Sequence, residues 1–193
     1  MTTTISSAVP ILVYLAFVPG IVWRARRRDA PRTTLIAQLL LGGWVAALIA
    51  LTLFPLPWRL GGGDMRIVSD PRGWPHPWAS ITPFETIGMS LQRGLGSLEG
   101  RVLIGNVVAF VPLGLLAPIV SARWRTAPRV LLLGLLVSTA VELAQLGWDL
   151  VVGMPWRAAD IDDVIVNTFG ALVGYGIWRL IPARLPRRAP VSA

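Results

Sequence analysis

The sequence predicts an all-α polytopic membrane protein, with residues 1–193 forming a single membrane domain of five transmembrane helices. Hydrophobic residues make up 54% of the 193 residues and the mean hydropathy is +0.63, which is more apolar than ordinary soluble domains. The apolar residues are gathered into runs close to the roughly 20 residues that cross a bilayer as a helix. Arginines stand between these runs. The predicted spans are about 5–23, 33–54, 102–122, 130–148 and 161–181.

The charge balance and its distribution indicate which kind of partner the chain has. All 18 basic residues are arginines, against 10 acids, which gives a net charge of +8. Such a balance is also typical of nucleic-acid-binding proteins, but arginines placed between apolar runs favour a lipid bilayer as the partner and no nucleic acid. The chain has no cysteine, so disulfides and thiolate metal sites are excluded. We predict no cofactor and no metal.

The first two spans are separated by a cluster of arginines. No charged side chain precedes the run 5–23, whereas five arginines lie within 24–32. A secretory signal peptide has the opposite order, with its positive charge before the apolar segment. The first run is therefore predicted to be a retained helix. The second run, 33–54, is long enough at about 1.5 Å per residue to cross a hydrocarbon core of roughly 30 Å.

Residues 55–101 form one long loop that is rich in Gly, Pro and Trp. Within it, Thr82-Pro83-Phe84-Glu85 has the pattern of a helix start, with Thr82 as N-cap, Pro83 at the first helical position and Glu85 closing a capping box. The apolar residues that follow lack a clean stripe. We therefore predict a short helix in this loop that lies at the membrane interface or folds back into the bundle.

The distribution of arginines predicts the orientation of the spans. The segments 24–32 and 123–129 and the tail after residue 181 carry five, three and three arginines, whereas the loop 149–160 carries only Arg157. Short arginine-rich segments remain on the cytoplasmic side of a membrane. The N-terminus and the long loop are therefore predicted to lie outside, and the C-terminus inside.

Polar residues inside or beside the last three spans predict a site between helices, because an acid at mid-helix costs roughly 2.5–3.5 kcal/mol on insertion scales. Glu142 lies six residues before Trp148, hence about 9 Å below the predicted outer boundary. Asn167 reaches a similar depth from the same side. We predict that three helices place one polar cluster in the outer half of the membrane, with Arg157 as the partner of Glu142. Its predicted members are Asn106, Ser138, Glu142, Gln145, Arg157, Asp160, Asp163 and Asn167.

The spacing of these residues predicts which faces they share. Ser138, Glu142 and Gln145 follow an i, i+4, i+7 pattern, which places them on one helix face. Asp160, Asp163 and Asn167 do the same on the last span. Small residues at 170 and 174 continue that stripe, and such a pattern is typical of close packing between membrane helices.

Each of these residues also has a purely structural interpretation. The acids at 160, 162 and 163 lie in the first turn of a helix, where carboxylates cap free N–H groups and interact favourably with the helix dipole. Glu142 and Gln145 would then join helices by hydrogen bonds, and Asn106 would do the same. Glu142 fits this interpretation least well, because a buried carboxylate requires a cation, a proton or several donors.

The motifs of the last three spans, taken together, resemble the VanZ-like family. The resemblance covers roughly residues 80–178 and includes Thr82-Pro83-Phe84 in the long loop, although Ser80 stands where the family usually has asparagine. It implies a multi-pass protein of the bacterial plasma membrane and a link to resistance against teicoplanin, a glycopeptide with a lipid tail. The matching motifs are Asn106 with Phe110-Val111-Pro112-Leu113-Gly114, Ser138-x3-Glu142-x2-Gln145, and Arg157-x2-Asp160-x2-Asp163-x3-Asn167-x2-Gly170-x3-Gly174.

Three function classes follow from these observations. The favoured one is binding or modulation of an outer-leaflet amphiphile, either a lipid-tailed glycopeptide or an envelope lipid, in an outward-facing polar pocket. The alternative is a hydrolase or transferase for a lipid-linked envelope substrate, with Glu142 as general base or with Glu142, Asp160 and Asp163 holding a divalent metal. A transporter is less favoured, because the five spans show no internal repeat and no acid in their inner halves.

Overall fold

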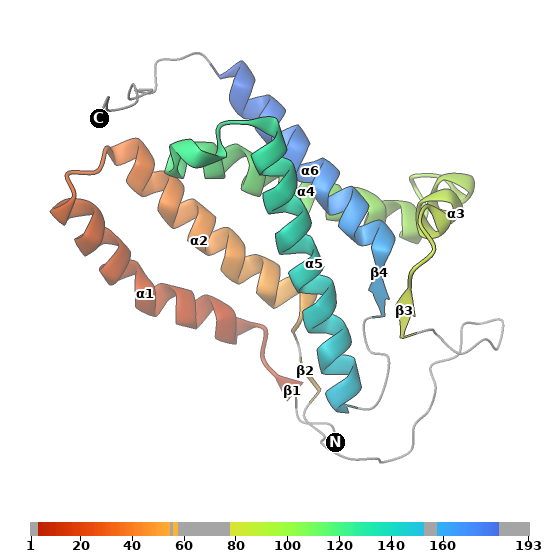
Figure 1. Cartoon of the computed structure of the whole chain (residues 1–193). Coiled ribbons are helices and arrows are strands. Elements are labelled where there is room, and N and C mark those ends of the chain that lie inside the picture. The colour runs from red at the N-terminus through yellow and green to blue at the C-terminus, as the bar shows by residue number, and fades with distance from the viewer. Residues whose placement is uncertain (1–3, 55, 58–77, 153–157, 182–193) are drawn as a thin grey trace.

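A computed structural model describes residues 4–54, 56–57, 78–152 and 158–181. These residues form an all-helical bundle with four very short strands (Figure 1). The elements are β1 (Thr4–Ile5), α1 (Ala8–Arg27), α2 (Arg32–Thr52), β2 (Leu56–Pro57), β3 (Ala79–Ser80), α3 (Glu85–Arg93), α4 (Leu98–Val120), the 3-10 turn η1 (Ala122–Trp124), α5 (Ala127–Val152), β4 (Ala159–Asp160) and α6 (Ile161–Leu180).

The long helices alternate in direction, so the bundle has two distinct ends (Figure 1). All four strands lie at one of them, which we call the strand end. There β1 pairs antiparallel with β2, and β3 pairs parallel with β4. The turns at 28–31 and 121–126 and the end of α6 lie at the opposite end, which we call the arginine end. The two arginine-rich segments within the described residues therefore share one side of the bundle.

Four helices are long and apolar enough to cross a membrane: α1, α2, α4 and α5. Their bounds agree with the first four predicted spans to within a few residues. The fifth predicted span is the 20-residue helix α6, which is not among the four. Its length suffices, but Asp162, Asp163 and Asn167 lower its apolarity.

Glycines bring α4 and α6 into backbone contact. A Cβ built at Gly170 lies 2.1 Å from the carbonyl oxygen of Val107, and one at Gly174 lies 2.0 Å from that of Val111. On the facing helix, a Cβ at Gly114 lies 1.7 Å from the carbonyl oxygen of Ala171. No side chain fits at these distances. The predicted close packing along 170 and 174 is confirmed, and Gly114 completes it from the opposite helix.

The apolar core lies where α2, α4, α5 and α6 meet. Around it, one hydrogen bond joins α2 to α4 and another joins α6 to the turn before α5. Trp44 Nε1 donates to the Ala109 carbonyl at 2.6 Å, and the Tyr175 hydroxyl donates to the Arg125 carbonyl at 3.0 Å. The indole N–H and the phenol O–H thus each find an acceptor in an apolar environment, as buried Trp and Tyr side chains usually do. The core cluster comprises Leu48, Phe110, Leu113, Val130, Ala171 and Tyr175.

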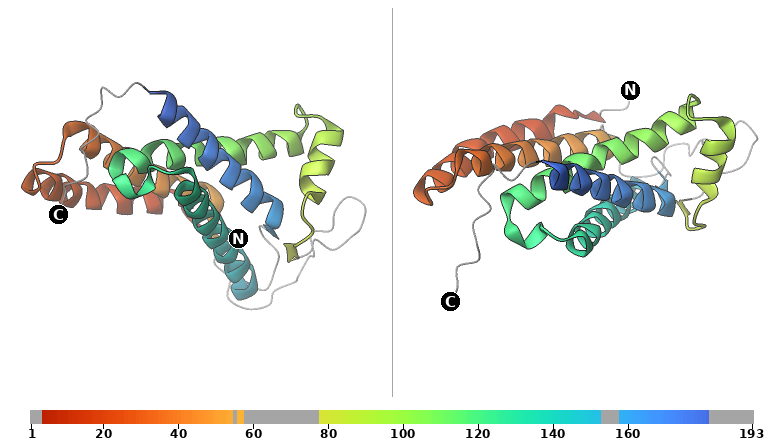
Figure 2. Two further views of the ribbon diagram at one scale, coloured as in Figure 1. Left: turned by 45° about the horizontal axis from the view of Figure 1, so that its top comes forward. Right: turned by 90° about the horizontal axis from the view of Figure 1, so that it is seen from above.

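The short helix predicted in the long loop is present as α3, which lies across the strand end of the bundle (Figure 2). The predicted capping box at its start is wrong. Thr82 and Pro83 precede the helix, and its N-cap is Phe84, with a left-handed φ of 67° and no cap from its own side chain. A phenyl ring has no acceptor for the free N–H groups of the first turn, so the cap must come from elsewhere.

A polar cluster between α3, α4, α5 and α6

The cap of α3 comes from Asp162 in the first turn of α6. Its Oδ1 accepts a hydrogen bond from Phe84 N at 2.6 Å, and its Oδ2 accepts one from Ile87 N at 3.0 Å. In a capping box these two N–H groups are satisfied by two side chains of the helix itself. Here one carboxylate from a distant helix satisfies both. Asp162 is 1% exposed, and it thereby fixes α3 on the bundle.

Asp160 joins three elements at the same place. Its Oδ1 accepts from Asp162 N at 2.9 Å and caps α6, while its Oδ2 accepts from the hydroxyl of Thr86 on α3 at 2.6 Å. Its own backbone N–H donates to Glu142 Oε2 on α5 at 2.9 Å. The capping interpretation of Asp160 therefore holds, and Glu142, which is 7% exposed, is tied to the start of α6.

Two further pairs lie along α6. Asn106 Nδ2 on α4 donates to Asp163 Oδ1 at 2.6 Å. One turn further on, Asn167 Nδ2 donates to Ser138 Oγ on α5 at 2.9 Å, with Ser138 fully buried. The structure thus brings together six of the residues predicted to form the site, in a ladder that begins at the strand end and continues along α6. They are Asn106, Ser138, Glu142, Asp160, Asp163 and Asn167.

Two predicted members do not belong to this ladder. Gln145 Nε2 donates to the carbonyl oxygen of Thr52 at the end of α2, at 3.0 Å. It joins α5 to α2, so Gln145 lies outside the ladder although its spacing from Ser138 and Glu142 is that of a shared helix face. Arg157 lies outside the described residues, and its pairing with Glu142 stays a prediction.

Two buried acids were missed as members of the cluster. Asp149, which is 0% exposed, accepts a hydrogen bond from Ala158 N at 3.2 Å and so holds the residue that directly precedes β4. Its spacing of seven residues from Glu142 was a usable signal, because it continues the same helix face. Asp162 was considered only as a cap of its own helix. No local pattern indicates that it caps α3, because its partners lie 78 and 75 positions away.

A pocket of about 210 Å³ adjoins this cluster between α3, α4 and α6. Thr86 and Ser90 of α3 and Asp163 of α6 line one side, where they expose very little polar surface to the pocket. Glu99 also lines the pocket and forms an ion pair with Arg93, and the Arg93 and Glu99 side chains are 45% and 40% exposed. The remaining wall is apolar and comes from Leu98, Val102 and Leu103 of α4.

The chemistry available to the acids is limited by their partners. Asp160 and Asp162 direct both oxygens at N–H or O–H donors, which leaves them a structural role. Within the described ranges, no group of three His, Cys, Asp or Glu side chains is arranged to hold a metal ion. Asp163 differs from the other two, because its carboxylate also lines the pocket.

The structure defines an all-helical protein in which carboxylate and amide side chains join α6 to helices that are long and apolar enough to cross a membrane. The sequence profile of the VanZ/LLP1 family matches residues 41–182. Because this match covers most of the chain, the protein belongs to the VanZ/LLP1 family. Searches of curated proteins and of solved structures found no match.

Proposed function

We propose that the pocket between α3, α4 and α6 binds an amphiphile from the outer leaflet of the bacterial plasma membrane. The observation that carries this proposal is a largely apolar pocket with a carboxylate in its lining. Leu98, Val102 and Leu103 offer an apolar surface to a tail, and Asp163 lines the same pocket while Asn106 holds its carboxylate. A hydrocarbon tail fits the apolar wall, and the carboxylate is the group that a polar head would contact.

The orientation supports an outward-facing pocket. The pocket lies at the strand end, and Arg123, Arg125 and Arg129 lie at the opposite end. Arginine-dense turns are retained in the cytoplasm, so we place the strand end outside, with α6 as a fifth span. The cost of Asp162 and Asp163 in that span is offset by their hydrogen bonds to α3 and α4.

Teicoplanin is the amphiphile that the family resemblance suggests. Its tail partitions into the outer leaflet, where each buried methylene contributes roughly 0.8 kcal/mol, whereas an untailed glycopeptide stays at the cell wall. Expression of the protein is therefore expected to raise the inhibitory concentration of teicoplanin more than that of vancomycin.

A variant that fills the pocket provides the test. Val102 lines the pocket and is 54% exposed, so a tryptophan fits there and Val102→Trp is expected to occlude the apolar wall. If the ligand loses contacts equivalent to two methylenes, at about 0.8 kcal/mol each, its affinity falls about fifteenfold, and the extra teicoplanin resistance should disappear. Val108→Trp is the matched control, because Val108 is 60% exposed on the same helix and does not line the pocket. Inhibitory concentrations are measured at equal membrane abundance. Unchanged resistance in Val102→Trp would contradict binding in this pocket.

An enzyme acting on a lipid-linked envelope substrate is the second candidate. One observation favours it: Asp163 lines the pocket with a carboxylate that Asn106 orients, as a general base requires. Altered wall chemistry does not depend on a lipid tail on the drug. Equal protection against teicoplanin and vancomycin, lost in Asp163→Asn, would therefore favour the enzyme over the binding protein.

A further inference from the structure

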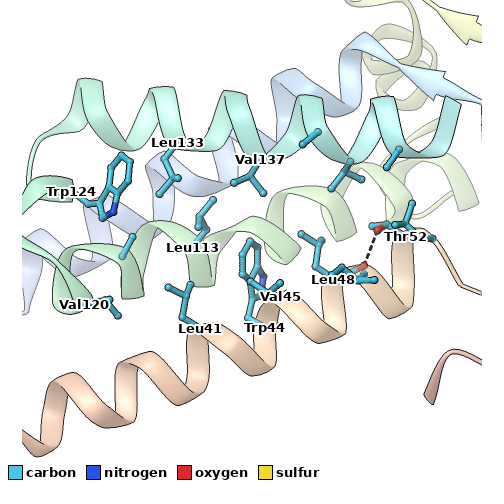
Figure 3. A pocket seen from close by; sticks show the side chains of 16 residues that line it. Leu41, Trp44, Val45, Leu48, Thr52, Leu113, Val120, Trp124, Leu133 and Val137 are labelled. Atoms are coloured by element: carbon cyan, nitrogen blue, oxygen red, sulfur yellow. Dashed lines mark hydrogen bonds between the residues drawn. The ribbon is translucent and has the colours of Figure 1, made fainter. Parts of the chain in front are cut away.

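A second cavity, of about 460 Å³, lies between α2, α4 and α5 (Figure 3). Leu41, Trp44 and Leu48 of α2 line it opposite Leu133 and Val137 of α5, with α4 behind. Apart from Thr52 at one end and the Trp rings, its lining side chains are hydrocarbon. It shares no lining residue with the pocket beside Asp163.

The two ends of this cavity differ. Towards the strand end, Gln145 bridges α5 to the Thr52 carbonyl, where Thr52 is the last residue of α2 and lines the cavity. Towards the arginine end, Val120 and Trp124 form the lining. There the Arg123 guanidinium carbon lies 4.8 Å from the centroid of the Trp124 ring. Gln145 therefore forms a hydrogen bond across one end, and the other end lies beside positive charge.

The positive charge at that end of the cavity has no acidic partner within the described part of the chain. Arg123 and Arg129 are exposed and Arg125 is half-buried. The backbone carbonyls of Pro118 and Arg123 accept hydrogen bonds from Arg125 Nε and Arg129 Nη1. These bonds leave most of the guanidinium N–H groups available, and guanidinium groups bind phosphate well.

The length of the cavity fits one hydrocarbon chain. On α5 its lining runs from Leu133 to Ala144, about 17 Å at 1.5 Å per residue. One leaflet of a core roughly 30 Å thick is about 15 Å deep. Arg129 precedes Leu133 by one helical turn, so a phosphate at the arginines lies next to the start of the apolar lining.

We propose that this cavity holds an acyl chain of an anionic phospholipid whose phosphate lies at Arg123, Arg125 and Arg129. A net negative head group is selected because this end carries three guanidinium groups and, among the described residues, Asp29 is the one acid at that end of the bundle. A zwitterionic lipid fills the cavity equally well with its chain but brings an ammonium group to the arginines.

Native mass spectrometry of the purified full chain tests the proposal. The protein is mixed with phosphatidylglycerol and phosphatidylcholine of identical acyl chains, and the bound lipids are counted. Phosphatidylglycerol is expected to be retained in excess, by about fivefold for each arginine that contacts the phosphate. Equal retention of the two lipids by the wild-type protein would overturn the proposal, whatever the variants do.

Matched variants separate the two parts of the site. Arg123→Gln should reduce the preference for phosphatidylglycerol by about fivefold, whereas Arg101→Gln, an equal loss of charge in the first turn of α4 near the strand end, should leave it unchanged. Ala140→Leu with Ala144→Leu fills the cavity wall and should reduce retention of both lipids. Thr139→Leu adds bulk to an exposed position outside the cavity and should not. Undiminished lipid in the filled variant would exclude the cavity as the site.

Discussion

Gly114→Ala is expected to remove most of the folded protein, although it adds only one methyl group. The new Cβ would lie 1.7 Å from the Ala171 carbonyl oxygen and 2.8 Å from Tyr175 N, so the α6 backbone has to move. Overpacking of a core usually costs 1–3 kcal/mol, and contact with backbone atoms leaves no flexible side chain to relieve the clash. We expect a loss above that range. Thermal unfolding in detergent and protein yield from membranes measure it.

Gly105→Ala is the matched control on the same helix. A Cβ at Gly105 meets nothing within 4 Å, and alanine is favoured over glycine in a helix by roughly 1 kcal/mol. The control should therefore be as stable as the wild-type protein or more so. Equal stability of the two variants would show that α4 and α6 do not approach as closely as the structure places them.

Asp162→Ala is expected to release α3 from the bundle while the long helices stay folded. The variant leaves Phe84 N and Ile87 N without their acceptors. Each hydrogen bond to a charged group contributes about 1.5–3 kcal/mol, and a 9-residue helix is too short to be stable by itself in water. Hydrogen exchange of the amides in Glu85–Arg93, and cleavage by trypsin after Arg93, should both accelerate by orders of magnitude.

Glu85→Ala provides the control for this effect. Glu85 lies in the first turn of the same helix and is exposed, so its removal should cost only the few tenths of a kcal/mol of a surface charge near a helix N-terminus. Asp162→Asn, which keeps one carbonyl acceptor, should fall between the two. Exchange in α3 that is as slow in Asp162→Ala as in Glu85→Ala would refute the capping role of Asp162.

The sequence was sufficient for features set by local pattern. Apolar runs of membrane length located the helices α1, α2, α4 and α5, because each must satisfy its own backbone groups in lipid. The small residues at 170 and 174 predicted the contact with α4, because glycine at this spacing permits close approach. The pairs of Asn106 with Asp163 and of Ser138 with Asn167 agree with the argument that polar groups at one depth meet between helices.

Features that depend on distant partners could not be obtained in this way. The start of α3 resembled a capping box, but the carboxylate that caps it is Asp162 on another helix. Gln145 lies seven residues after Ser138 yet forms its hydrogen bond with α2. One face of a helix can contact two neighbouring helices, so the spacing does not determine which of them a side chain reaches. The burial of an acid also does not indicate whether its carboxylate binds a ligand or accepts hydrogen bonds from backbone N–H groups.

Cysteine accessibility tests most directly whether the pocket at the strand end faces outward. The chain has no native cysteine. The labelling of a single cysteine introduced at Ser6, Ile81 or Ala127 is therefore measured without a signal from other thiols of the protein. All three positions are exposed, the first two at the strand end and the third at the arginine end. In intact cells, an impermeant thiol reagent is expected to label Ser6→Cys and Ile81→Cys at once, and Ala127→Cys only after permeabilisation. Labelling of Ala127→Cys in intact cells, with the other two protected, would place the pocket in the cytoplasm and contradict the proposed function.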